Sequence, residues 1–166
     1  MFYDPSAFAF VPVLERHWRD IYAEYLGVRP DLVDWHEKKL YDEGWKVLTM
    51  YDFPHGQPIP ETIRKCPVTS ALVREHIPTH GVAGFSVLRP QTRIKPHQGY
   101  QGNFLRCHLA LQVPPGDTAL VVNGELRRWE VGKALVFDDR VWHEAWNLAD
   151  DERVVLLIDF VPSTNK

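Results

Sequence analysis

Apolar residues in the first part of the chain recur at the spacing of an amphipathic helix. One stretch repeats them every third or fourth position, which places them on one helix face. These positions are Leu14, Trp18, Ile21 and Tyr25. Asp4 and Pro5 form a helix start, with a capping side chain followed by a residue preset for the first helical position. Gly27 and Pro30 end the pattern, so we expect one face of this segment to pack on another element.

Two more helices are expected before the pattern changes. One is predicted from residue 30 to about residue 42, with Gly44 as its stop, and one over residues 69–77. After Gly81, short β-rich runs alternate with turn signals. The runs are GVAGFSVL, TRIKPH, NFLRCHLALQV, TALVVNGELRRW, KALVFDD, HEAWN and RVVLLIDFV. Asn123-Gly124 lies between β-branched residues and predicts a hairpin.

This order of elements predicts one α+β domain, mainly β, spanning residues 1–166. Three helices followed by at least seven short strands favour a sandwich or jelly roll with the N-terminal helices packed outside. Residues 1–80 would form a mainly helical support and residues 81–162 the jelly-roll core. There is no internal repeat and no linker.

Composition and charge narrow the range of partners. Hydrophobic residues make up 45% and charged residues 25% of the chain, as is typical of soluble globular proteins. A net charge of −3 without blocks of like charge argues against nucleic acid and anionic membranes, and favours a small-molecule or protein partner. No stretch reaches the ~18 apolar residues that span a bilayer, so a cytoplasmic protein without membrane contact is expected.

Cys66 and Cys107 are expected to be free thiols.

The stretch IKPHQGYQGNFLRCHLAL carries charge where a core strand is usually apolar. Side chains alternate along a strand, so Arg106 and His108 share one face while Cys107 and Leu109 share the other, uniformly apolar face. If helices cover the apolar face, the charges point inward, where an unpaired charge is costly. The same reasoning makes Arg153 a second inward arginine. We therefore expect a polar ligand site inside the barrel.

Two inward arginines favour a ligand with carboxylate groups, because the guanidinium fork matches a carboxylate. The alternative is that each arginine pairs with an acid of the protein, such as Asp159 or Glu152. Both interpretations are compatible with the sequence.

Three of the eight histidines stand out by their position. The others are interpreted as ordinary surface or core groups: His17, His36, His55, His76 and His80. His97 and His108 lie in the charged stretch IKPHQGYQGNFLRCHLAL. His143 has the spacing of the second cupin motif, although the turn before it lacks that motif's proline and glycine. Two imidazoles on facing strands are typical of non-haem iron, whose third ligand is usually a carboxylate. Gly99 occupies that carboxylate's position.

Several stretches in order resemble a known family. They are GWKVL, CPVT, FSVLRPQTRIKPHQG, LRCHLAL, WEVGKALVFDD, HEAWN and RVVLLIDFVP. From about residue 44 to residue 162 the sequence resembles the aspartyl/asparaginyl β-hydroxylases, Fe(II)- and 2-oxoglutarate-dependent oxygenases with a double-stranded β-helix. These enzymes hold iron with two histidines and no carboxylate.

The resemblance implies a role for each inward side chain. His97 and His143 would be the catalytic iron ligands, with water completing the shell. Arg106 and His108 would lie at the 1-carboxylate of 2-oxoglutarate. Arg153 and Ser86 would bind its 5-carboxylate. The expected partners are then a small-molecule substrate, 2-oxoglutarate and O2.

The reaction implied is hydroxylation of an unactivated carbon, coupled to decarboxylation of 2-oxoglutarate to succinate. The chain looks more like compact bacterial members than like the anchored eukaryotic ones, so an amino acid, an amino-acid-derived molecule or a natural-product intermediate is expected as substrate. The family's usual residues are replaced at residues 100–103 and at Arg140, near the expected substrate mouth.

Other readings of these residues stay open. A three-histidine cupin-type dioxygenase would use His97, His108 and His143 without 2-oxoglutarate. A non-catalytic jelly-roll module would bind an acidic ligand through its arginines. An iron site without a carboxylate ligand could also hold chloride and halogenate the substrate.

The residues around His143 are expected to have structural roles. Asp138 and Asp139 are expected to shape the turn before His143, and Trp142 and Trp146 are expected to pack in the core.

Overall fold

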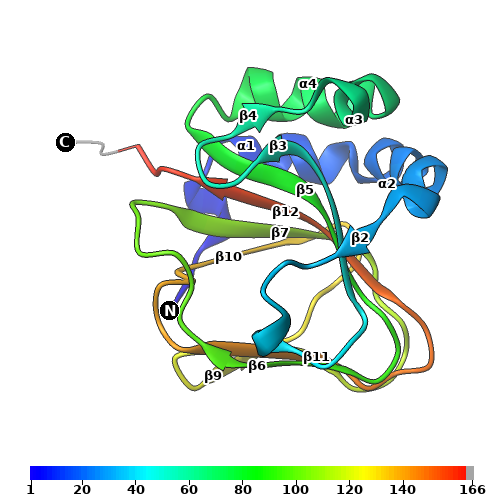
Figure 1. The fold of residues 1–166 in the computed structure, drawn as a ribbon. Coiled ribbons are helices and arrows are strands. Elements are labelled where there is room, and N and C mark those ends of the chain that lie inside the picture. The colour runs from blue at the N-terminus through cyan, green and yellow to red at the C-terminus, as the bar shows by residue number, and fades with distance from the viewer. Residues whose placement is uncertain (164–166) are drawn as a thin grey trace.

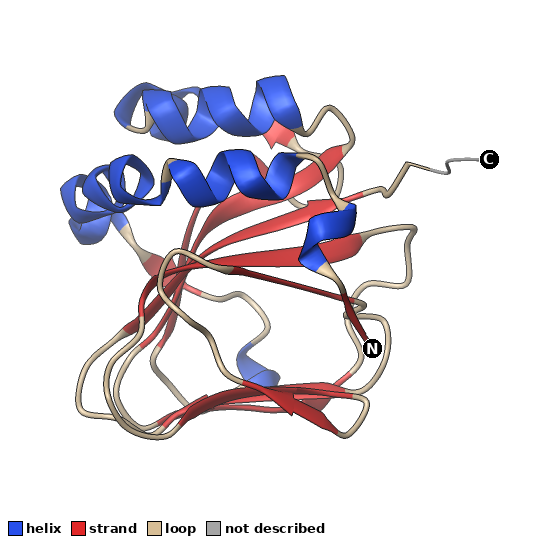
Figure 2. Cartoon of the chain, turned by 180° about the vertical axis from the view of Figure 1, so that it is seen from behind, coloured by secondary structure: helices blue, strands red, loops and turns tan. Residues whose placement is uncertain are grey.

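Two antiparallel sheets face each other in a jelly roll, and helices cover the outer face of the larger sheet (Figure 1). Seen from behind, the helices form one layer above the larger sheet, and the smaller sheet closes the opposite side (Figure 2). This computed structural model describes residues 1–163. The predicted α+β, mainly β fold is confirmed.

The larger sheet has eight strands, in the order β1, β10, β7, β12, β5, β3 and β2, with β4 beside β3. Their bounds are β1 Phe2–Tyr3, β2 Val33–Asp34, β3 Trp45–Asp52, β4 Gln57–Pro58, β5 His80–Leu88, β7 Leu105–Gln112, β10 Ala134–Phe137 and β12 Arg153–Phe160. The long strands β7 and β12 run side by side at its centre, and this pairing sets Asp159 opposite Arg106.

The smaller sheet has four strands, in the order β6, β11, β8 and β9. Their bounds are β6 Thr92–His97, β8 Thr118–Val122, β9 Glu125–Arg127 and β11 His143–Asn147. The hairpin predicted at Asn123-Gly124 joins β8 to β9, and both turn residues have positive φ, 48° and 81°. Asparagine and glycine tolerate that conformation, which is why this pair signals the turn.

The helices are α1 Phe10–Arg16, α2 Trp18–Val28, α3 Pro60–Lys65 and α4 Pro67–His76, with short 3-10 turns at Pro5–Ala7, Arg29–Asp31 and Lys38–Leu40. Asp4 caps the first turn as expected, accepting a hydrogen bond from the Ser6 backbone N–H. The alternation along β7 is also as expected. Cys107 and Leu109 belong to the core between helices and sheet, whereas Arg106 and His108 face the space between the sheets.

The helix predicted at residues 30–42 is wrong. Two 3-10 turns and strand β2 occupy that segment, because β2 pairs with β3 and Trp35 is buried against Trp45, with ring centroids 4.4 Å apart. Tertiary pairing overrides a weak local helix preference here. The first 80 residues also contribute four strands to the larger sheet, so that sheet extends beyond the expected core of 81–162.

Cys66 and Cys107 are buried free thiols, as predicted. Across residues 1–163, none of the helices has the length and apolar character needed to cross a membrane.

The buried face of β12 should dominate stability. Leu156 is fully buried between the helices and the larger sheet. We expect Leu156→Ala to lower the free energy of unfolding by about 2–5 kcal/mol, through lost burial and a residual cavity. Urea unfolding measures this. The matched control is Leu126→Ala in β9, which is 47% exposed and should change stability by less than ~0.5 kcal/mol. Equal losses in the two variants would contradict this placement of the core.

Candidate functional site

Two histidines from facing strands meet between the sheets. His97 ends β6 and His143 begins β11, and the two residues are register partners. Their ring centroids are 4.2 Å apart. The structure thus brings together the pair expected to hold iron.

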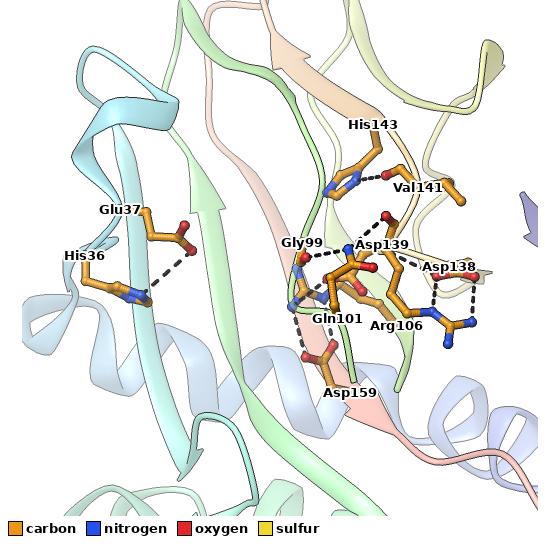
Figure 3. A network of polar contacts seen from close by, with 11 residues as sticks. His36, Glu37, Gly99, Gln101, Arg106, Asp138, Asp139, Val141, His143 and Asp159 are labelled. Atoms are coloured by element: carbon orange, nitrogen blue, oxygen red, sulfur yellow. Dashed lines mark hydrogen bonds and ion pairs between the residues drawn. The ribbon is translucent and has the colours of Figure 1, made fainter. Parts of the chain in front are cut away.

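Both histidines are held in the same way by their own strands. His97 Nδ1 lies 2.7 Å from the Lys95 carbonyl oxygen. His143 Nδ1 lies 2.8 Å from the carbonyl oxygen of Val141 (Figure 3). A carbonyl only accepts, so each Nδ1 carries the proton and each Nε2 keeps its lone pair. Burial lowers the pKa of His143 to about 3, and the neighbouring His97 and Arg106 act in the same direction. A neutral imidazole oriented by a backbone carbonyl is the usual form of a metal ligand.

Arg153 is a buried cation that has no acidic partner among the described residues 1–163. It is 1% exposed, and its guanidinium contacts the Ser86 carbonyl at 3.2 Å and the Ser86 hydroxyl at 3.4 Å. Its Nε has no hydrogen-bond partner within the described part of the chain. Burial lowers the pKa of Arg153 to about 9, which leaves it charged at neutral pH. A buried charge of this kind calls for an anionic ligand.

His108 presents a second unpaired donor to the same cavity. Its Nδ1 accepts a hydrogen bond from the Trp129 indole N–H at 3.2 Å, so the proton of the neutral ring resides on Nε2. That Nε2 has no partner among residues 1–163. Burial, followed by the charges of Arg153 and Arg106, lowers the pKa of His108 well below its ordinary value. His108 is therefore a neutral N–H donor.

Trp129 supports both of these donors. Besides its bond to His108, its ring lies under the Arg153 guanidinium, with Cζ 4.5 Å from the ring centroid. Ser86 is oriented from the other side, because its hydroxyl accepts a hydrogen bond from the Trp45 indole N–H at 3.0 Å. The two tryptophans thus fix the donors of Ser86, His108 and Arg153 around one cavity. The sequence did not indicate this role for the tryptophans.

Arg106 differs from Arg153, because it has protein partners. Its Nε and Nη2 donate to the two Asp159 oxygens at 2.7 and 2.9 Å, and Nη2 lies 3.3 Å from Asp139 Oδ2 (Figure 3). Burial opposes the positive charge, but the two carboxylates outweigh it and raise the pKa of Arg106. The sequence left open whether each arginine binds a ligand or pairs with an acid of the protein. Among the described residues, Arg106 pairs with protein acids and Arg153 does not.

Asp139 explains why residue 99 is a glycine. A Cβ built on Gly99 would collide with the Asp139 carboxylate, and the Gly99 N–H donates to the Asp139 carbonyl at 2.7 Å. The space that a side chain at position 99 would take is thus filled by Asp139. Asp138 shapes the turn as expected, since it accepts from the backbone N–H of Arg140 at 2.9 Å.

The site has an inner cavity and an outer vestibule. The inner cavity, about 30 Å³, brings together all six predicted site residues. They are Ser86, His97, Arg106, His108, Arg153 and His143. The vestibule, about 380 Å³, shares Trp45, His97 and Arg106 with it and opens to solvent. The inner cavity and the vestibule are therefore neighbouring compartments of one site.

One expectation for the neighbouring residues is wrong, because Trp142 is 60% exposed rather than packed. His36 is an exposed histidine, as interpreted from the sequence, and it lines the vestibule. Across residues 1–163, no three His, Cys, Asp or Glu side chains are grouped to hold a metal ion. The three-histidine alternative thus lacks its site, since His108 turns a protonated Nε2 to the cavity.

Comparison with known proteins identifies the family. The aspartyl/asparaginyl beta-hydroxylase family matches residues 15–162. The chain belongs to the aspartyl/asparaginyl beta-hydroxylase family. It is 42% identical over 122 residues to the ornithine lipid ester-linked acyl 2-hydroxylase of Rhizobium tropici, covering 72% of this chain and 42% of that protein. It is 35% identical over 165 residues to human aspartate beta-hydroxylase domain-containing protein 2, covering 90% of this chain and 43% of that protein. This member of the family therefore spans less than half of these relatives.

Solved structures agree on the fold. A 2OG-Fe(II) oxygenase family oxidoreductase from Burkholderia pseudomallei has a TM-score of 0.64 at 12% identity, over 84% of this chain and 77% of the other. A Pseudomonas putida prolyl-4-hydroxylase has a TM-score of 0.56 at 14% identity, over 88% of both chains. This hydroxylase-family member thus has the fold of the 2OG-Fe(II) oxygenases.

The buried neutral histidines predict a loss of stability in acid. The unfolded pKa of a histidine is about 6.5, and that of folded His108 lies well below it, so the unfolded chain binds more protons below pH 6.5. The stability that His108 contributes is present above pH 6.5 and is lost as pH falls below that value. We expect urea unfolding of metal-free His108→Gln to lose less stability between pH 7.5 and 5 than the parent. Exposed His76→Gln is the control, and equal pH slopes in His108→Gln and the parent would contradict the prediction.

The partners of Arg106 predict a structural role for Asp159. Asp159→Asn removes a carboxylate from a buried pair, which typically costs about 3–5 kcal/mol. We expect that loss in urea unfolding at pH 7.5. Asp117→Asn, which alters an exposed pair with Arg128, should cost less than ~1 kcal/mol. An unchanged Asp159→Asn protein would mean that Arg106 is free to bind a ligand carboxylate.

Proposed function

We propose that this chain is an Fe(II)- and 2-oxoglutarate-dependent oxygenase that hydroxylates an unactivated carbon of an amino-acid-derived small molecule. The observation that carries the proposal is the unpaired, buried Arg153 in the cavity that also contains His97 and His143. A cation, two metal-ligand imidazoles and a neutral donor in one enclosed space fit a metal with an anionic cosubstrate.

The donor set fits a dicarboxylate. Arg153 and the Ser86 hydroxyl would bind the 5-carboxylate, because the free Nε and the nearby hydroxyl offer two donors from adjacent strands. The His108 Nε2–H would donate to an oxygen of the keto-acid end. Arg106 contributes less directly than the family resemblance implies, since its guanidinium is engaged by Asp159 and Asp139. Its part would be to hold Asp139 against Gly99.

His97 and His143 would hold the iron through their Nε2 atoms. When bound, iron and 2-oxoglutarate together supply the oxidising power for attack on a C–H bond. The chain's own contribution is to present two neutral imidazoles, orient the cosubstrate by its carboxylates and enclose the centre between two sheets. Asp139 would face the open side next to Gly99, where many related sites have a carboxylate ligand.

The substrate would enter through the vestibule. One relative is named for hydroxylating ornithine lipid at its ester-linked acyl chain, and others are named for aspartyl or asparaginyl hydroxylation. The common element in these names is an amino acid or a molecule built on one. An amino-acid-derived substrate, including an amino-acid-based lipid, agrees with these names and with a half-open mouth of about 380 Å³.

Anaerobic optical titration tests the proposal. Fe(II) and then 2-oxoglutarate are added to the purified protein, and a metal-to-ligand charge-transfer band is expected when the keto acid chelates the iron. His97→Ala should abolish the band, and Arg153→Ala should raise the 2-oxoglutarate concentration needed by at least ~10-fold, as for a lost charge-assisted pair. Arg128→Ala, at an exposed arginine, is the matched control.

The outcomes separate the rival functions. No band in folded, iron-loaded protein would overturn 2-oxoglutarate dependence. Carboxylate binding without iron binding would instead favour a non-catalytic module. Thermal melting of each variant shows whether a lost band reflects the site or the fold.

A further inference from the structure

The vestibule carries more acidic than basic charge. Its charged lining consists of Glu37, Asp139 and Arg106, with the titratable His36 and His97. Arg106 also pairs with Asp159, which lies behind the vestibule wall. One guanidinium therefore faces two buried carboxylates, Asp139 and Asp159, and Glu37 adds a third carboxylate. No lysine of residues 1–163 lines this space. The mouth of the site is therefore suited to a cation rather than an anion.

Glu37 is the vestibule acid without a close partner. Its Oε1 lies 3.8 Å from His36 Nε2, beyond hydrogen-bond distance, and the two side chains are 43% and 66% exposed. Figure 3 shows Glu37 and His36 together, facing the side of the site that carries Gly99 and Arg106. The neighbouring Lys38 turns to Asp34 at 2.7 Å. Glu37 thus keeps acceptor capacity for a ligand.

The cations closest to the mouth are engaged elsewhere. Arg106 uses Nε and Nη2 on Asp159, and Nη2 also approaches Asp139. Arg140 forms a bidentate pair with Asp138, through Nε at 2.8 Å and Nη2 at 2.7 Å. A substrate carboxylate would meet arginines whose Nε and Nη2 already bind protein carboxylates, whereas an ammonium group would meet Glu37.

Aromatic rings form the rest of the vestibule wall. Trp35 and Trp45 stack with centroids 4.4 Å apart, and Phe53 and Tyr100 meet edge to face at 5.1 Å. Phe53 and Tyr100 are 40% and 42% exposed, so their rings form an apolar patch at the mouth of the site. Aromatic faces attract cations and also cover aliphatic chains. Trp45 continues the wall into the inner cavity, so an apolar segment lying on it would approach His97.

We propose that the vestibule selects a substrate bearing an ammonium group next to an apolar segment, with Glu37 as the counter-ion of the ammonium. The proposal rests on the proposed oxygenase function, for which it names the substrate's charge. The ammonium group lies between Glu37 and the exposed rings of Phe53 and Tyr100. The apolar segment runs along Trp45 toward the metal site.

Binding of three matched probes tests the charge preference. Hexylammonium, hexanol and hexanoate share the alkyl chain and differ in charge. Each is titrated into the Fe(II)- and 2-oxoglutarate-loaded protein without oxygen, with the fluorescence of the vestibule tryptophans as readout. We expect hexylammonium to bind tightest and hexanoate weakest. Hexanoate binding as tightly as hexylammonium would overturn the proposal.

Glu37→Gln locates the preference on one side chain. It keeps the size and removes the charge, and we expect hexylammonium binding to weaken about fivefold, as for a part-exposed ion pair, with hexanol binding unchanged. Glu75→Gln on α4 is the matched control, because Glu75 is 60% exposed and lies outside the vestibule lining. Unchanged hexylammonium binding in Glu37→Gln, or equal weakening in Glu75→Gln, would overturn the assignment.

The charge-transfer band separates the two proposals. If the band forms with 2-oxoglutarate but hexylammonium shows no preference, the oxygenase function stands and the substrate inference fails. If the band does not form, the function fails, and hexylammonium binding to the metal-free protein still reports on Glu37.

Discussion

The arrangement between the two sheets depends on one charge, the guanidinium of Arg153, which is almost fully buried and pairs with no carboxylate of residues 1–163. Removing such a charge from water is expensive, and the structure offsets only part of that cost, with a serine carbonyl and the face of Trp129. The free side of the guanidinium points into the cavity with His97 and His143. A dicarboxylate that completes the ion pair would also place its other end near the histidines.

The second arginine shows how the same residue type serves a different purpose a short distance away. Arg106 lies between Asp159 and Asp139, and the two carboxylates balance its buried positive charge. The cluster fixes Asp139 where a side chain of residue 99 would otherwise lie, and so accounts for the glycine at that position. A buried ion cluster of this kind contributes more to positioning than to stability. The result is a two-histidine site with a carboxylate beside it that is committed to an arginine.

The two halves of the site divide its tasks. The inner cavity is small and lined by hydrogen-bond donors, whereas the vestibule is larger, aromatic and acidic. The family and the fold agree with the proposed oxygenase function, and the relatives' names mention an ornithine lipid and aspartyl or asparaginyl groups. In the proposed function, substrate specificity resides in the vestibule residues that would meet the substrate.

Local patterns in the sequence were enough for the strands after residue 80, the hairpin at Asn123-Gly124 and the inward face of β7, because alternation and turn preference act over a few residues. They missed the four strands of the first 80 residues. The sequence also singled out the six residues that the inner cavity brings together, with the roles of His97 and His143 suggested by family resemblance. It could not distinguish Arg106 from Arg153. Only the register of β7 against β12 sets Asp159 beside Arg106, across 53 positions of chain.

The vestibule, too, was decided by tertiary structure. Residues 30–42 read as a helix, yet pairing of β2 with β3 and stacking of Trp35 on Trp45 place Glu37 at the mouth of the site. Only the fold places Trp129 under Arg153 and beside His108. Contacts between segments that are distant in the sequence decide which side chains face one another. A local sequence pattern does not predict these contacts.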